Sequence, residues 1–126
     1  MSFDLSVIPN KNIIVAVTGG IAAYKSAILV RRLKDAGFNI RVVMTKGAQA
    51  FITPLTFQAL SGNAVHTELL DPEAEAGMGH IELARWADLL LVAPATCDSL
   101  AKFAAGLADD LLSTLYLATN APVWVA

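Results

Sequence analysis

Two apolar segments rich in β-branched residues lie near the start of the chain, with a helical pattern between them. Residues 13–18 and 39–44 are short and apolar, as strands buried on both faces of a sheet are. Between them, apolar residues recur at helical spacing before a glycine that ends the pattern: Ala22, Leu29, Leu33, Ala36 and then Gly37. A strand, a helix and a strand of this length predict two parallel strands joined by a right-handed crossover.

The same alternation continues along the rest of the chain. We expect a short helix and then one from Pro54 to Ser61, a short strand at 64–69, an acidic loop at 70–79, a helical segment at 80–87, a strand at 89–93, a helical region interrupted at Gly106, and a last strand from 121. This order predicts an α/β fold, a Rossmann-like (flavodoxin-like) open parallel sheet with helices on both faces, in one domain over residues 1–126. Ligands of such sheets bind beyond the carboxyl ends of the strands.

Composition narrows the classes of partner. The chain is 56% hydrophobic and 16% charged, which is apolar for a soluble domain and predicts helix faces covered by other subunits. No segment approaches the ~20 apolar residues of a membrane span. A net charge of −2 without a basic block argues against nucleic-acid binding. Cys97 is the single cysteine, so no internal disulfide forms, and the first residues lack a signal-peptide pattern; both favour the cytoplasm.

A glycine pair, Gly19 and Gly20, follows the first predicted strand in the stretch "VTGGIAAYKSA". Lysine and serine follow at the spacing of a P-loop, but Tyr24 stands where its second glycine belongs. The dinucleotide fingerprint fails as well, because the next three positions that could complete it hold no glycine. Two interpretations remain open: amides at a helix start that hold an anion, or an ordinary strand-to-helix turn.

Polar residues follow two further predicted strands. Thr45 comes after the second strand, where its hydroxyl could bind a phosphate oxygen or cap the next short helix, and both interpretations stay open. The loop after the third strand reads "APATCDS", in which hydroxyl, thiol and carboxylate groups could line a flat polar ligand: Thr96, Cys97, Asp98 and Ser99. Alternatively, Asp98 or Ser99 caps the following helix and Cys97 is a small loop residue.

The chain holds two histidines. His66 lies in the predicted short strand, whereas His80 follows a glycine-bearing loop and opens the next helix. A histidine at that place can serve as a general base, or it can simply cap the helix. The histidines and nearby glutamates match no metal-ligand spacing, so we expect no metal site.

In order and spacing, four stretches together resemble the homo-oligomeric flavin-containing cysteine decarboxylases, and among them the phosphopantothenoylcysteine decarboxylases of coenzyme A biosynthesis. The resemblance runs from about Asn12 to Ala126 through "VAVTGGIAAYKS", "VVMTKGAQAFITPLTFQALSGN", "HIELARWADLLLVAPAT" and "LAKFAAGLADDLLST". It implies an enzyme that binds FMN and converts phosphopantothenoylcysteine to phosphopantetheine. It also implies trimers or dodecamers with flavin sites at subunit contacts.

The resemblance assigns roles to residues already singled out. Gly19, Gly20 and Ile21 would lie near the flavin phosphate and ribityl chain together with Thr45, whereas Thr96, Cys97, Asp98 and Ser99 would line the flavin. His80 matches the active-site histidine of the family. Such a site explains the opening glycines, because a single flavin phosphate needs neither a nucleoside triphosphate nor the second P-loop glycine.

The same resemblance implies that the domain continues past Ala126, with further substrate-contacting residues and a flap. We therefore expect the 126-residue chain by itself to bind FMN weakly and not to decarboxylate. Two other functions remain open at the level of sequence: a flavin-binding regulatory protein without turnover, and a flavin prenyltransferase, against which His80 argues. The failed fingerprints disfavour a dinucleotide-binding domain.

Overall fold

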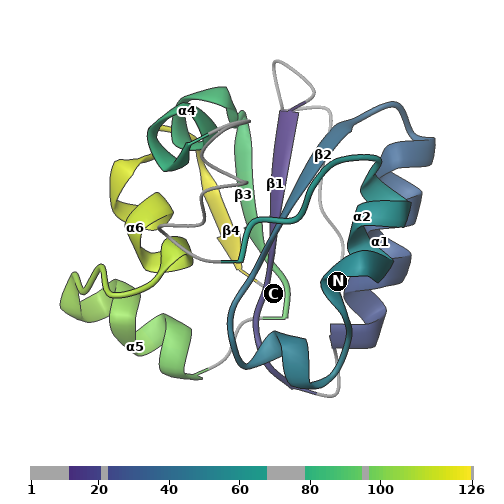
Figure 1. Cartoon of the computed structure of the whole chain (residues 1–126). Coiled ribbons are helices and arrows are strands. Elements are labelled where there is room, and N and C mark those ends of the chain that lie inside the picture. Colours follow the sequence, from purple (N-terminus) through teal and green to yellow (C-terminus); the bar gives the residue numbers. More distant parts are fainter. Residues whose placement is uncertain (1–11, 21–22, 68–78, 95–96, 126) are drawn as a thin grey trace.

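The computed structural model describes residues 12–20, 23–67, 79–94 and 97–125. Within them, four strands form one sheet in the order β2-β1-β3-β4 (Figure 1). The strands are β1 (Asn12–Val17), β2 (Asn39–Met44), β3 (Leu89–Val92) and β4 (Val123–Val125). The helices are α1 (Ala23–Asp35), the 3-10 turn η2 (Ala48–Ala50), α2 (Pro54–Ser61), α4 (His80–Trp86), α5 (Cys97–Ala105) and α6 (Leu111–Ala118).

All strand pairs in this sheet are parallel, as the strand–helix–strand pattern predicts. β1 pairs with β2 from Asn12↔Asn39 to Val17↔Met44, and its other edge pairs with β3. β3 in turn pairs with β4. β1 therefore lies inside the sheet with a neighbour on each side, which explains its continuous apolar sequence.

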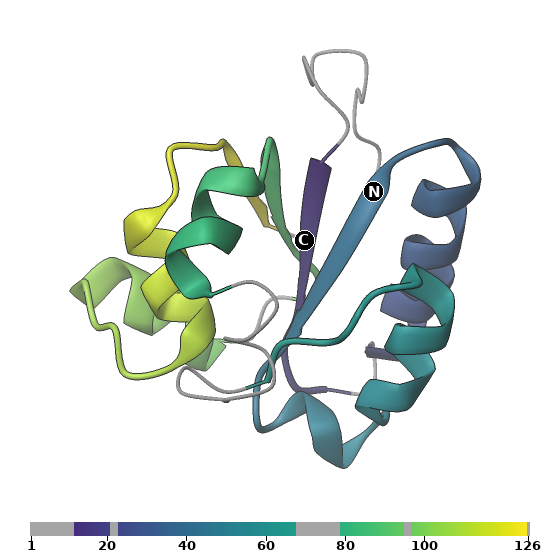
Figure 2. The same ribbon diagram turned by 45° about the horizontal axis from the view of Figure 1, so that its top comes forward.

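Helices cover both faces of the sheet (Figure 2). Successive side chains of a strand point to opposite faces, so Ile13, Val15 and Val17 pack against α1 and α2 in one core cluster. Ile14 and Ala16 pack instead among residues of α4 and α6 in a second cluster. The open α/β fold with helices on both faces is thereby confirmed.

The buried face of α1 differs from the predicted one. Its buried residues are Ala23, Ser26, Val30 and Leu33, whereas Ala36 is exposed and Leu29 is only partly buried. Ala22 lies outside the described residues. Leu33 is buried as predicted and Leu29 packs against the core, but the buried Ser26 was missed because the prediction counted apolar residues alone. The hydroxyl of Ser26 donates a hydrogen bond to the carbonyl of Ala93.

Most other boundaries agree with the predicted elements. α2 begins at Pro54 and ends before Gly62, whose φ of 76° closes the helix, and Gly106 with φ 69° separates α5 from α6. Of the strand predicted at 64–69, the described residues show only a bridge between Val43 and His66, whose side chain is buried. The acidic loop lies outside the described residues except for Gly79. Among the described residues, no helix has the length and apolar character needed to cross a membrane.

Candidate functional site

The loops that follow β1 and β2 meet at the carboxyl edge of the sheet. Thr18 and Gly19 continue from β1, and Thr45 continues from β2. The amide of Thr45 donates a hydrogen bond to the carbonyl of Val17 at 3.0 Å. This bond extends the ladder one step past the paired strands and holds the two loops side by side.

The glycine pair is required by the backbone at this meeting point. A Cβ on Gly19 would lie 3.3 Å from the carbonyl carbon of Gly47, in the loop after β2, which is tighter than ordinary van der Waals contact. Gly20 has a φ of 129°, a conformation that favours glycine. The sequence therefore allows a close approach between two backbone segments at the sheet edge, independently of any ligand.

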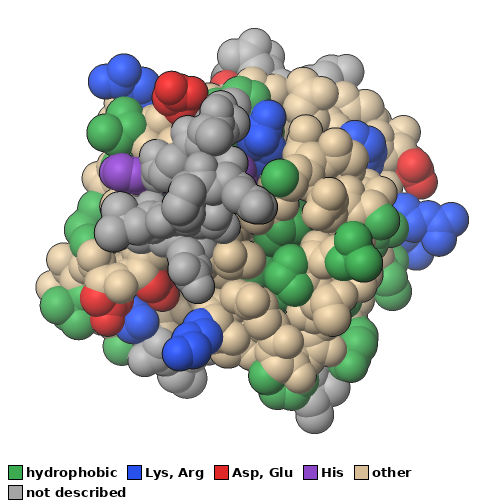
Figure 3. Space-filling view, viewed as in Figure 1, with side chains coloured by type: hydrophobic (Ala, Val, Ile, Leu, Met, Phe, Trp, Pro, Cys, Tyr) green, Lys and Arg blue, Asp and Glu red, His purple; other side chains and the backbone are tan. Residues whose placement is uncertain are grey.

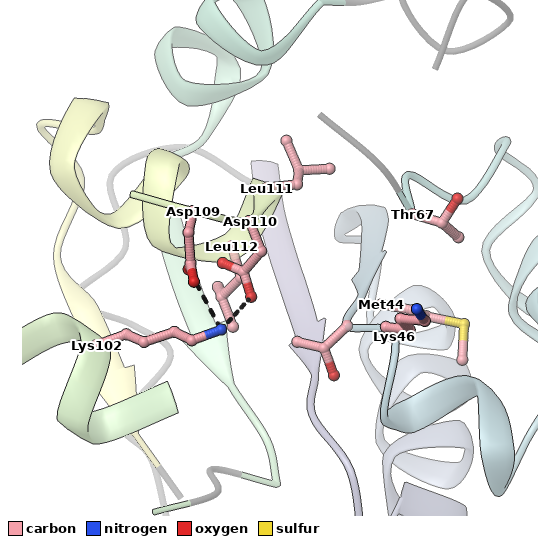
Figure 4. A pocket seen from close by; sticks show the side chains of 9 residues that line it. Met44, Lys46, Thr67, Lys102, Asp109, Asp110, Leu111 and Leu112 are labelled. Atoms are coloured by element: carbon pink, nitrogen blue, oxygen red, sulfur yellow. Dashed lines mark hydrogen bonds and ion pairs between the residues drawn. The ribbon is translucent and has the colours of Figure 1, made fainter. Parts of the chain in front are cut away.

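A cleft runs along this edge between the β1 and β2 loops and the helices α5 and α6. One part is a cavity of about 290 Å³ lined by Gly19, Thr45, Lys46, Gly47, Ser99, Lys102 and Asp110. The adjoining part, about 380 Å³, shares Thr45, Lys46, Lys102 and Asp110 and adds Met44, Thr67, Asp109, Leu111 and Leu112 (Figure 4). We call the two parts together the edge cleft; its size suits a small-molecule ligand.

The structure brings some of the predicted site residues together. Gly19, Thr45 and Ser99 line the edge cleft, and Gly20 adjoins Gly19. Ile21 and Thr96 lie outside the described residues. Cys97 and Asp98 form the start of α5, and their side chains also lie outside the description. No finding tests the binding role of these residues, which stays a prediction.

Thr45 already uses its hydroxyl within the protein. The hydroxyl accepts a hydrogen bond from the amide of Ala48 at 3.3 Å and lies 3.5 Å from the carbonyl of Val17. The hydroxyl thus binds the first residue of η2, although the N-cap of this short helix is Gly47. Thr45 also lines the edge cleft, and the phosphate interpretation stays a prediction.

His80 is the first residue of α4, and two residues separate the end of α4 from the start of β3. The end of α4 lies at the amino edge of the sheet, where the carbonyl of Trp86 accepts a hydrogen bond from the side chain of Asn12. His80 is partly buried and is not among the described residues that line the edge cleft. Its catalytic role stays a prediction from the resemblance.

A charged cluster in the edge cleft was missed by the sequence interpretation. The ammonium group of Lys102 on α5 lies 3.3 Å from a carboxylate oxygen of Asp109 and 3.4 Å from one of Asp110. Figure 4 shows Lys102 reaching between both carboxylates. In Figure 3, basic and acidic side chains gather at the lower left, over the connection between α5 and α6. This cluster ties that connection to α5.

Asp110 also caps α6. One of its carboxylate oxygens accepts hydrogen bonds from the amide of Ser113 at 2.8 Å and from the hydroxyl of Ser113 at 2.5 Å. Partial burial raises the pKa of Asp110, but the bonds from Ser113 and the charge of Lys102 outweigh burial and hold this pKa below its usual value of 3.8. The signal for this cap was present in the sequence as Asp-x-x-Ser before an apolar run.

Replacing Asp110 with alanine is expected to lower the free energy of unfolding by about 1 kcal/mol at neutral pH, because α6 loses its cap. The folded pKa lies below the unfolded one, so the carboxylate stabilises the fold above pH 3.8 and loses this effect as the pH falls through the folded pKa. Denaturant unfolding of both proteins between pH 7 and pH 3 should show the difference shrinking on acidification.

Asp109 provides the matched control for this test. Its side chain is 62% exposed and shares the same lysine, but α6 is capped by Asp110. Asp109→Ala is therefore expected to change the free energy of unfolding by less than about 0.5 kcal/mol. Equal losses for both variants would show that the lysine contact, and not the helix cap, carries the effect.

Comparison with known proteins places the chain among flavin-binding proteins. A family model described as Flavoprotein matches residues 4–126. The coenzyme A biosynthesis bifunctional protein CoaBC of Vibrio vulnificus strain YJ016 is 60% identical over 122 residues, which cover 97% of this chain. The chain spans about 30% of the length of that relative.

Two solved structures with the same fold are described as decarboxylases. The FMN-dependent cysteine decarboxylase SpaF superposes with a TM-score of 0.83 at 34% identity, over 94% of this chain and 68% of that one. A PPC decarboxylase mutant complexed with pantothenoylaminoethenethiol superposes with a TM-score of 0.72 at 29% identity, over 93% of this chain and 66% of that one.

Proposed function

The chain belongs to the Flavoprotein family, and from this premise we propose that it binds FMN and carries the decarboxylation of 4′-phosphopantothenoylcysteine to 4′-phosphopantetheine in coenzyme A biosynthesis. The observation that carries the proposal is 60% identity along 97% of the chain to a bifunctional protein of that pathway. The likeness to FMN-dependent cysteine decarboxylases supports the same reaction.

The residues of the edge cleft fit FMN. This cofactor combines a phosphate with a flat, largely apolar ring system. The cleft offers a glycine turn and Lys46 on the side of β1 and β2, and the apolar side chains of Leu111, Leu112 and Met44 on the other part of its lining. A Cβ on Gly19 would meet Gly47, so the glycines keep this approach open.

Within this proposal, the residues of the chain bind and orient. Gly19, Gly20 and Thr45 would hold the phosphate side of the cofactor, and Ser99 would contact it from α5. FMN, when bound, supplies the reversible electron transfer that makes loss of the substrate carboxylate feasible. His80 takes up or returns a proton at an imidazole nitrogen during turnover. Burial of the ligand between the loops after β1 and β2 and the helices α5 and α6 would limit the access of water.

Binding and turnover test the proposal separately. The purified full-length protein is expected to show a flavin absorption spectrum, directly or after addition of FMN and dialysis. With phosphopantothenoylcysteine it is expected to release carbon dioxide. A preparation that stays colourless would contradict FMN binding, whereas a yellow preparation without carbon dioxide release would favour the regulatory alternative.

We also propose that the protein self-associates into trimers or larger assemblies in the cytoplasm. On the outer side of α1 and α2, Tyr24 is 58% exposed, Ile28 54% and Leu55 71%. Tyr24 and Ile28 are four residues apart on α1 and so are neighbours on its surface, and contiguous exposed apolar side chains of this kind suit an interface with a partner. The substrate thiol must stay reduced, which suits the cytoplasm. Sedimentation of a single monomeric species would contradict self-association. Recovery of the protein outside the cytoplasmic fraction would contradict the cytoplasmic location.

A further inference from the structure

Two buried hydroxyls hold consecutive carbonyls at the end of β3. The hydroxyl of Ser26 donates to the carbonyl of Ala93 at 2.5 Å, and the hydroxyl of Thr18 donates to the carbonyl of Pro94. Thr18 is 0% exposed and Ser26 is 3% exposed. The Ser26 bond is buried and the Thr18 bond is part-buried, so a donor lost from the Ser26 bond is not replaced easily by water.

Both donors come from the segment that carries the glycine turn. Thr18 directly precedes Gly19, and Ser26 lies in the first turn of α1, just after that turn. The acceptors lie far away in the sequence, by 76 residues for Thr18 and by 67 for Ser26. The two bonds thus join the first strand–helix unit to the start of the loop that leads from β3 to α5.

These bonds begin where the backbone ladder between β1 and β3 ends. The amide of Ala93 donates to the carbonyl of Ala16 at 2.9 Å, which is the last step of the ladder on this side of β3. From the carbonyl of Ala93 onward, side-chain hydroxyls take the place of strand partners. Thr18 and Ser26 therefore hydrogen-bond the backbone at the point where the chain leaves the sheet.

We propose that Thr18 and Ser26 are positioning residues that fix Ala93 and Pro94, where the chain leaves β3, against the end of β1 and the start of α1, so that the two sides of the edge cleft are aligned before a ligand binds. The inference rests on the proposed function for its ligand, FMN. Gly19 and Ser99 line the same cavity; Thr18 directly precedes Gly19, and the two acceptors, Ala93 and Pro94, precede Ser99 in the chain. An aligned site loses less conformational freedom on binding and so binds more tightly.

Hydrogen exchange of the cofactor-free full-length protein tests the alignment without reference to FMN. Thr18→Val keeps the shape of the side chain and removes the donor, and Ser26→Ala removes the other donor. Each is expected to raise the amide exchange rate at Ala93 and along α5 by about tenfold, while exchange in β2 stays unchanged. Thr18→Ser keeps a hydroxyl and is expected to exchange like the parent.

A matched control lies at the opposite edge of the sheet. Thr119 donates from its hydroxyl to the carbonyl of Ala84 at 3.1 Å and accepts from the amide of Ala121 at 3.1 Å, and Thr119→Val removes both bonds away from the edge cleft. This control is expected to leave exchange at Ala93 and α5 unchanged. If Thr18→Val does not fold, Ser26→Ala decides, because it removes only one oxygen from a helix.

FMN titration then tests the consequence for binding. Thr18→Val and Ser26→Ala are expected to raise the dissociation constant of FMN roughly three- to tenfold, with Thr18→Ser and Thr119→Val near the parent value. Unchanged exchange and unchanged affinity in both donor variants would overturn the inference. A parent protein that binds no FMN would overturn the proposed function, and the exchange rates would still decide whether the two hydroxyls position the loop.

Discussion

Replacing His80 with asparagine is expected to leave FMN bound and to lower the rate of decarboxylation by about 10²–10⁴-fold, the usual contribution of a general acid–base group. Asparagine occupies a similar space and can hydrogen-bond, but its side chain has no group that gains or loses a proton near neutral pH. The expectation rests on the match of His80 to the family's active-site histidine, since His80 is not among the described residues of the edge cleft. Turnover and the flavin spectrum are measured on the same full-length preparation.

Glu82 offers a control on the same helix. It is exposed in the first turn of α4, so Glu82→Gln removes a charge near His80 without touching the edge cleft. This variant is expected to keep parental turnover within about twofold, because a surface charge near a helix start contributes only a few tenths of a kcal/mol. Parental turnover in His80→Asn would show that His80 has no acid–base role, whatever the control does.

Gly19→Val is expected to weaken FMN binding by at least about tenfold, which corresponds to about 1.4 kcal/mol. Already the Cβ of the new side chain would lie 3.3 Å from the carbonyl carbon of Gly47, and this neighbour is backbone rather than a movable side chain. The two branches of valine would force the loops after β1 and β2 apart. The glycine turn and Thr45 would then no longer face the same part of the edge cleft.

Loss of stability by itself could also weaken binding, so a second glycine variant separates the two effects. Gly62 has a φ of 76° at the end of α2 and does not line the edge cleft. Gly62→Ala is expected to cost about 1 kcal/mol of unfolding free energy and to leave FMN affinity unchanged. FMN binding by Gly19→Val at parental affinity would contradict a ligand at the glycine turn.

The architecture followed from local patterns in the sequence. Strands buried on both faces need continuous apolar residues, and helix ends need residues such as Gly62 and Gly106 that accept a positive φ. These requirements act within a few residues, so the order of elements and the parallel sheet could both be predicted. The glycine turn and Thr45 could be located at the carboxyl edge for the same reason, because they directly follow strands.

The contacts that complete the edge cleft depend on segments far apart in the chain. Ser26 interrupts the apolar pattern of α1, and its burial is explained only by the carbonyl of Ala93, 67 residues away. Lys102, by contrast, is only eight residues from Asp110, but it meets Asp109 and Asp110 across the connection between α5 and α6, which nothing in its own helix indicates. Sequence patterns by themselves determined the fold and the family, since local hydrophobic periodicity indicates the fold and local motifs indicate the family. Only the tertiary structure decided which hydroxyls and charges meet at the cleft, because a buried polar group is set by its partner in space.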